Sequence, residues 1–132
     1  MKDLLQQIKD RMEPYAEKLR SIGIKTEWTP ECSSPYCSIY QLLIDKNDID
    51  VGYITVVKPK NKMIVCFAIN SRISEHKTIT FDNGSTMAYT LYNYTSFNEE
   101  EFDQVFNWCC EIVKFVKEFR QKEKELKISK DF

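Results

Sequence analysis

The chain has 132 residues, of which 42% are hydrophobic and 30% charged, a composition typical of a globular protein and too apolar for a disordered one. Its 19 basic and 20 acidic residues give a formal net charge of −1, so no global field of one sign attracts nucleic acid or an acidic membrane. We therefore expect one folded domain over residues 1–132, with no nucleic-acid partner and no membrane association.

The N-terminal segment shows helical periodicity. Pro14 interrupts the pattern, and a proline inside a helix removes one backbone hydrogen bond and clashes with the preceding turn. The sequence thus leaves open a kinked helix and a second helix that starts with Pro14 in its first turn. We expect Gly23 to end the segment and residues 26–35, with two prolines and two serines, to form a loop. The periodic apolar residues are Leu5, Ile8, Met12, Tyr15, Leu19 and Ile22.

Between residues 36 and 94 the pattern changes to short runs rich in Ile, Val, Tyr, Phe and Thr, which are enriched in strands. The breaks between the runs are too short for crossover helices, which predicts an antiparallel β-meander of about four to five strands. Asn83-Gly84 gives the strongest hairpin signal, because a type I′ turn needs positive φ at both central residues. For residues 70–78 a loop and a short helical turn both remain open. The predicted strands cover 36–45, 49–58, 62–70, 77–82 and 85–94.

The last segment predicts a long helix. Asn98 is a good N-cap, Glu101 stands three residues later as its capping-box partner, and Phe97 with Phe102 fits a hydrophobic staple. In the tail, residues 121–132, lysines alternate with glutamates, which predicts a solvated, fraying helical extension with intrahelical charge pairs. The fold class is α+β, with the C-terminal helix packed on a curved sheet. The apolar stripe of this helix comprises Phe102, Val105, Phe106, Cys109, Ile112, Val113 and Val116.

The cysteines indicate a reducing compartment. Their number, five, is odd, and Cys66 and Cys109 lie in apolar patterns, so we expect these two to be buried free thiols. Charged residues interrupt the first ten positions, and no apolar signal segment is visible there. We therefore expect a cytoplasmic protein.

No motif specifies a reaction. The three glycines are isolated from one another, so neither of the glycine-rich phosphate-binding motifs is present, and a single histidine does not make a zinc site. We expect no cofactor, no metal and no catalytic residue. Cys37 and His76 form the best catalytic alternative, as a thiol–imidazole pair in a sheet cavity of an enzymatic or ligand-binding domain. Nothing in their spacing requires that pairing.

Aromatic residues exceed what a sheet covered on one face needs. Successive residues of the strands are apolar at both parities, so either each helix covers one face or the second face is open to a partner. The leading hypothesis is a small protein-interaction module of adaptor, chaperone-like, immunity or inhibitor type. Its partner is another protein, with a second copy in a two-fold dimer as one candidate. The predicted interface residues are Trp108, Phe115, Phe119, Tyr40, Tyr92 and Tyr94.

Overall fold

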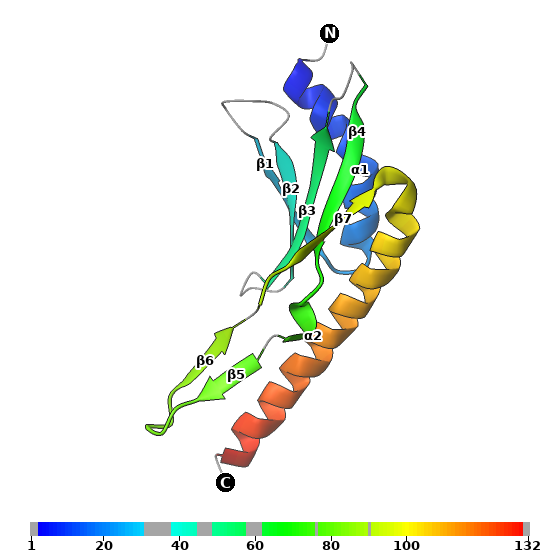
Figure 1. Cartoon of the computed structure of the whole chain (residues 1–132). Helices are drawn as coiled ribbons and strands as arrows, with labels where there is room; N and C mark the ends of the chain where they lie inside the picture. Colours follow the sequence, from blue (N-terminus) through cyan, green and yellow to red (C-terminus); the bar gives the residue numbers. More distant parts are fainter. Residues whose placement is uncertain are drawn as a thin grey trace.

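The structure, a computed structural model, describes residues 3–30, 38–44, 49–57, 62–75, 77–89 and 91–130 (Figure 1). An N-terminal helix is followed by strands, two short 3-10 helices and a long C-terminal helix, which confirms the predicted α+β fold. The elements are α1 (Leu4–Ser21), β1 (Lys25–Thr29), β2 (Ile39–Ile44), β3 (Ile49–Val57), β4 (Ile64–Asn70), η2 (Ile73–Glu75), β5 (Lys77–Thr80), β6 (Thr86–Tyr89), β7 (Tyr94–Asn98), η3 (Glu99–Glu101) and α2 (Phe102–Lys130).

Five strands form the main sheet in the order β1-β2-β3-β4-β7, and every neighbouring pair is antiparallel. Strands β2, β3 and β4 are consecutive antiparallel neighbours and confirm the first three strands of the predicted meander. The strands β5 and β6, however, pair only with each other and form a two-stranded ribbon that projects beyond one end of the sheet (Figure 1). The chain then returns through β7, which lies beside β4.

Two elements differ from the sequence prediction. The segment expected to be a loop contains β1, whose Trp28 lies opposite Tyr40 of β2. Strand β1 lies at the sheet edge, where its backbone bonds to β2 while exposed side chains alternate with half-buried ones, so an overall polar sequence suffices. Helix α1 is a single helix that includes Pro14, and the two-helix alternative is wrong. Gly23 ends α1 with positive φ, as expected, and its N–H donates to the Arg20 carbonyl at 3.1 Å.

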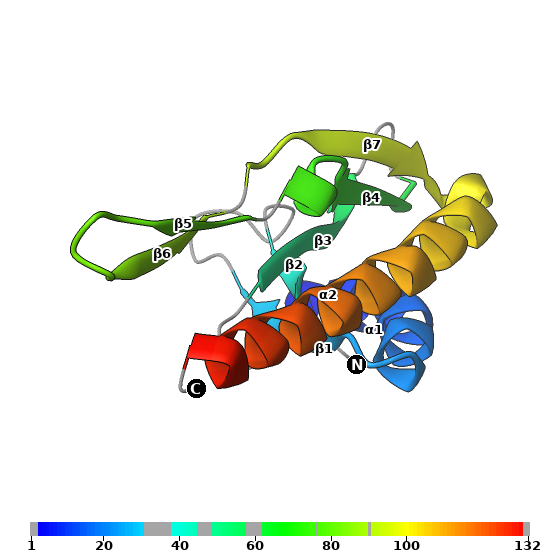
Figure 2. The same ribbon diagram turned by 90° about the horizontal axis from the view of Figure 1, so that it is seen from below.

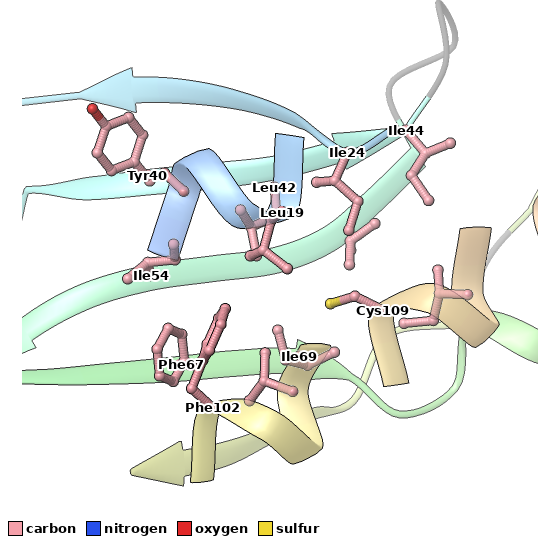
Figure 3. Close-up of a cluster of buried hydrophobic side chains, with 14 of the residues drawn as sticks. Leu19, Ile24, Tyr40, Leu42, Ile44, Ile54, Phe67, Ile69, Phe102 and Cys109 are labelled. Atoms are coloured by element: carbon pink, nitrogen blue, oxygen red, sulfur yellow. The ribbon is translucent and has the colours of Figure 1, made fainter. Parts of the chain in front are cut away.

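Both helices pack on the same face of the sheet (Figure 2). The ring of Phe67, on β4, lies 5.4 Å from that of Tyr15 on α1 and 5.4 Å from that of Phe102 on α2. One β4 side chain therefore contacts both helices, and the alternative with one helix on each face is wrong. The inward side chains of β2, β3 and β4 fill the space under the helices (Figure 3). None of the described helices lies on the opposite face of the sheet (Figure 2).

A β-bulge in β3 explains part of the unusual strand pattern. Gly52 pairs with Leu42, but the next pair joins Asp50 to Leu43, so Val51 is an extra residue in β3. Both Val51 and Ile54 are consequently buried although they stand at opposite parities. Gly52 has φ +147° and its backbone approaches β4 so closely that an added Cβ would lie 2.0 Å from the Ala68 carbonyl oxygen. In β3, apolar residues at both parities therefore do not require a second covering layer.

Candidate functional site

The ribbon formed by β5 and β6 carries exposed apolar side chains. Ile79 lies directly opposite Met87, and Phe81 follows two residues after Ile79, so these three side chains share one face of the ribbon. They remain 38%, 50% and 47% exposed, respectively. A polar turn closes the ribbon, where the Ser85 N–H donates to Asn83 Oδ1 at 3.0 Å and Gly84 has positive φ. The turn lies where Asn83-Gly84 predicted one, but it is not a two-residue type I′ turn. The Gly84 N–H donates to the Phe81 carbonyl and the Phe81 N–H to the Ser85 carbonyl, both at 2.9 Å, so residues 82–84 form a three-residue loop.

Tyrosines gather where the chain leaves the ribbon and enters β7. The rings of Tyr92 and Tyr94 stack with 6.4 Å between centroids, and Tyr94 also makes an edge contact with Tyr53 at 5.7 Å. The Tyr94 hydroxyl donates a hydrogen bond to Asp50 Oδ2. Partial burial, together with this bond to a carboxylate, raises the pKa of Tyr94 well above its ordinary value of 10.0. The result is a partly exposed aromatic surface with the Asp50 carboxylate beside it.

The base of the ribbon is held by a buried polar side chain. Asn70, at the end of β4, has no exposed surface. Its Oδ1 accepts from the Arg72 N–H at 3.0 Å and from the Asn93 N–H at 3.1 Å, and its Nδ2 donates to the Leu91 carbonyl at 3.3 Å. Asn70 thus bonds to the backbone both before and after the ribbon and fixes the two segments relative to each other.

A second pair of bonds reinforces this base. The Ser71 N–H and the Ser71 hydroxyl both donate to the Asn93 carbonyl, at 2.8 and 2.7 Å. The 3-10 turn η2, which begins at Ile73, occupies the segment for which a loop and a helical turn were both open. Its Ile73 side chain is buried in the core. The ribbon is therefore attached to the main sheet through hydrogen-bonded and buried residues.

The sequence-predicted interface residues fall into three groups. Tyr92 and Tyr94 lie together on the surface, as described above. Trp108 and Phe115, on α2, are half-buried against the core. Tyr40 is almost fully buried, and its hydroxyl donates to the Glu13 carboxylate, so it offers no surface to a partner.

The three aromatic residues of α2 do not form one exposed patch. The Trp108 ring makes an edge contact with Phe97 of β7 at 5.7 Å, so β7 covers part of it. Phe115 stacks with Phe119 at 6.3 Å between centroids, and both are half-buried. These residues complete the packing of α2 more than they extend its accessible surface.

The catalytic alternative, Cys37 with His76, lies outside the described residues. Among the residues that the structure does describe, no group of three His, Cys, Asp or Glu side chains is placed to hold a metal ion. Cys109 is buried as expected, and burial raises the pKa of its thiol to about 12. Cys66 is only half-buried, since its position in β4 points to the face without helices.

Glu99, at the start of η3, accepts hydrogen bonds from two side chains of α1. Arg11 Nη2 donates to Glu99 Oε1 at 2.7 Å, and the Tyr15 hydroxyl donates to Oε2. Burial alone would raise the pKa of Glu99, but the bonds from Tyr15 and Arg11 outweigh it and hold that pKa below the ordinary 4.5. Glu99 therefore joins α1 to the start of the C-terminal helical segment. The predicted capping box at Asn98 is also present, with Glu101 Oε1 accepting from the Asn98 N–H at 2.9 Å.

Sequence reasoning missed the ribbon residues Ile79, Phe81 and Met87, because their segments were assigned to the main sheet. One signal was available: residues 78–81 read Thr-Ile-Thr-Phe, a polar–apolar alternation that the central strands lack. Such alternation is typical of a strand with one solvated face.

Comparison of the chain with protein-family models, with curated proteins and with solved structures found no match. Within the described part of the chain, none of the helices is both long and apolar enough to cross a membrane.

Proposed function

We propose that this protein is a small protein-interaction module that binds its partner through the ribbon and the adjoining tyrosines. One observation carries the proposal. Among the described residues, seven large hydrophobic side chains stay exposed, and six of them lie between positions 79 and 94. These six are Ile79, Phe81, Met87, Leu91, Tyr92 and Tyr94.

The size of this surface supports a binding role. Side chains of about 200 Å² each, exposed at 38–50%, leave roughly 500 Å² of surface on the six residues together. Soluble monomers rarely expose contiguous apolar patches beyond a few hundred Å², and a stable interface takes about 800 Å² from each partner. The six residues would thus supply more than half of one side of an ordinary interface.

The architecture also supports it. An isolated two-stranded ribbon is marginally stable in water, and a third strand or a covering apolar surface stabilises it. Asn70 and Ser71 hold the ribbon in a fixed position, so little conformational entropy is lost when a partner binds. Methionine and aromatic side chains such as Met87 and Tyr92 are enriched at protein interfaces.

The partner we propose is another protein, and a second copy of the chain is one candidate. A cytoplasmic location belongs to the same proposal and rests on the odd number of cysteines. Trp108 and Phe115 were also predicted as interface residues. Because Trp108 packs on Phe97, its truncation would loosen the fold as well as any interface, so the ribbon offers the cleaner test.

The test uses the double variant Phe81→Ser, Met87→Ser and the matched control Val57→Ser. Val57 and Phe81 are both 47% exposed, but Val57 lies at the end of β3, away from the ribbon. The wild type and both variants are compared by sedimentation across micromolar concentrations and by quantitative capture of proteins from the native host.

We expect the ribbon variant to lose self-association, or at least one protein captured by the wild type, while Val57→Ser retains both. Circular dichroism and thermal unfolding must show that the ribbon variant is folded. If all three proteins are monomeric and capture the same set of proteins, the ribbon is not a binding surface and the proposal fails.

A further inference from the structure

The sheet-facing stripe of α2 changes its chemistry after Val116. Up to that residue the stripe is apolar and buried, whereas Arg120 and Lys124 continue it at four-residue steps. Strand β2 ends nearby at Ile44, and α2 extends beyond the same end of the sheet as the ribbon (Figure 1). The helix from residue 117 to 130 is on the order of 20 Å long. This overhang therefore presents a basic surface where the core ends.

A cleft of about 440 Å³ lies between the end of β2 and the overhang. Ile44 and Val116 give it an apolar floor, and they are only 7% and 4% exposed. The volume falls within the range of ligand-binding clefts, about 300–1,000 Å³. The cleft is lined by Ile44, Val116, Lys117, Arg120, Gln121 and Lys124, three of which are cationic and none of which is acidic.

Two of the three cationic residues of the cleft, Lys117 and Lys124, have no acidic residue of α2 at pairing distance, which is three or four positions away. Neither forms a salt bridge within the described chain. Lys114 and Lys122, on another face, each lie four positions from Glu118. The predicted intrahelical charge pairs concerned the tail, residues 121–132, where Lys122 has the required spacing to Glu118 but Lys124 has no acidic residue at that spacing. Lys117 lies before that tail.

The helix dipole does not account for these lysines either. Favourable interaction of cations with a helix C-terminus is confined to the last turn. Lys117 stands 13 residues before Lys130, the last residue of α2, which is more than three turns. Among the described residues, Lys117 and Lys124 therefore lie beside the apolar floor with no salt-bridge partner.

We propose that this cleft binds an acidic segment of a partner protein, with one apolar side chain against Ile44 and Val116 and flanking carboxylates beside Lys117 and Lys124. The charge of the cleft selects the acidic groups. The apolar floor selects a peptide over a bare anion, because phosphate gains nothing from Ile44. The inference rests on the proposed function in that the occupant is a protein, but it uses a surface separate from the ribbon.

The probe is a fluorescein-labelled peptide of alternating Glu and Gly around a single central Leu, studied by fluorescence anisotropy with the full chain. Two further peptides replace Leu by Ser or every Glu by Gln. The protein variants are Lys117→Gln with Lys124→Gln, and the control Lys114→Gln with Lys122→Gln, which removes equal charge from helix positions outside the cleft. Inorganic phosphate and single-stranded DNA serve as competitors. Amide chemical shifts of the ¹⁵N-labelled protein locate the bound peptide.

We expect the Leu peptide to shift the amides of Ile44 and of residues 116–124, and both altered peptides to bind at least fivefold more weakly. Lys117→Gln with Lys124→Gln should weaken binding of the Leu peptide about tenfold, and the control Lys114→Gln with Lys122→Gln less than twofold. Raising the salt concentration should weaken binding further, as screening requires.

The proposal is overturned if the Leu peptide does not bind, if the two lysine pairs weaken binding equally, or if the Ser peptide binds as tightly as the Leu peptide. It is also overturned if phosphate or DNA displaces the peptide at equal concentration, because the site would then be a general anion site. The ribbon variant separates this result from the proposed function. If Phe81→Ser, Met87→Ser loses captured proteins but the wild type does not bind the Leu peptide, only the cleft inference fails. If the wild type binds the Leu peptide but Phe81→Ser, Met87→Ser captures the same proteins as the wild type, only the ribbon proposal fails.

Discussion

Replacement of Asn70 by alanine should detach the ribbon from the sheet. The change removes the acceptor for two backbone N–H groups, those of Arg72 and Asn93, and the donor to the Leu91 carbonyl. A buried polar group left without a partner costs about 1–3 kcal/mol, but Arg72, Leu91 and Asn93 are themselves exposed, so water can replace part of the lost bonds and we expect a total of about 2–4 kcal/mol. Whole domains of this size are stable by only about 5–15 kcal/mol, so the loss is a large fraction of the total.

The matched control is Ser71→Ala. It removes one hydroxyl donor to the Asn93 carbonyl, but the Ser71 N–H still donates to the same oxygen at 2.8 Å. No buried group loses its last partner, and we expect a cost of only about 0.5–1 kcal/mol. Both variants delete a polar side chain at the base of the ribbon, so the difference between them isolates the role of Asn70.

Two measurements decide the outcome. Urea unfolding gives the free-energy change of each variant, and native-state hydrogen exchange reports local opening. In Asn70→Ala the amides of β5 and β6 should exchange faster by a larger factor than those of β2 and β3. The reasoning is refuted if Asn70→Ala costs no more than Ser71→Ala, or if ribbon amides keep their wild-type exchange rates.

Three further predictions concern the core and the charged groups. Because the folded pKa of Glu99 is depressed, its stabilising contribution is present above pH 4.5, its ordinary pKa, and is lost as the pH falls through the folded pKa. The difference in urea midpoint between the wild type and Glu99→Gln should therefore shrink on acidification. A difference that stays constant with pH would contradict this. Iodoacetamide in mild alkali should alkylate half-buried Cys66 in the native protein but Cys109 only after unfolding, as mass spectrometry of peptides will show. Phe102→Ala should cost about 3–5 kcal/mol and half-buried Phe115→Ala clearly less, and equal losses in thermal unfolding would mean that the two rings are equally buried.

Local chemistry allowed much of the fold to be predicted. The spacing of Ile8, Met12 and Leu19 identified α1, and these are three of its four buried residues. The capping residues Asn98 and Glu101 located the start of the C-terminal helix within a few residues, although a turn of 3-10 helix precedes Phe102. In each case the signal depends on neighbours within one or two turns of the chain, which a sequence displays directly.

The candidate sites were predicted less well. Tyr92 and Tyr94 were chosen as interface residues and lie on the surface, but Tyr40, chosen for the same reason, is buried beneath the helices. Aromatic character does not distinguish the two outcomes, because a tyrosine with a hydrogen-bonded hydroxyl is stable in either environment. Lys124 was overlooked because the alternation of Lys and Glu in residues 121–132 was taken as helical pairing, and only the spacing of three and four residues tests that.

The sequence by itself determined the α+β class and the antiparallel pairing of short connected strands. It also determined the end of α1 at Gly23, the start of the C-terminal helix at Asn98 and the position of the turn at Asn83-Gly84. These follow from periodicity, capping and turn preferences, which are local energies. Only the tertiary structure decided that both helices lie on one face, that Val51 is an extra bulge residue, and that the ribbon leaves the sheet while β7 takes its place beside β4. Such choices depend on the free energy of burying groups distant in sequence, Asn70 with Asn93 and Phe67 with Tyr15 and Phe102, and no local pattern encodes which of these groups meet.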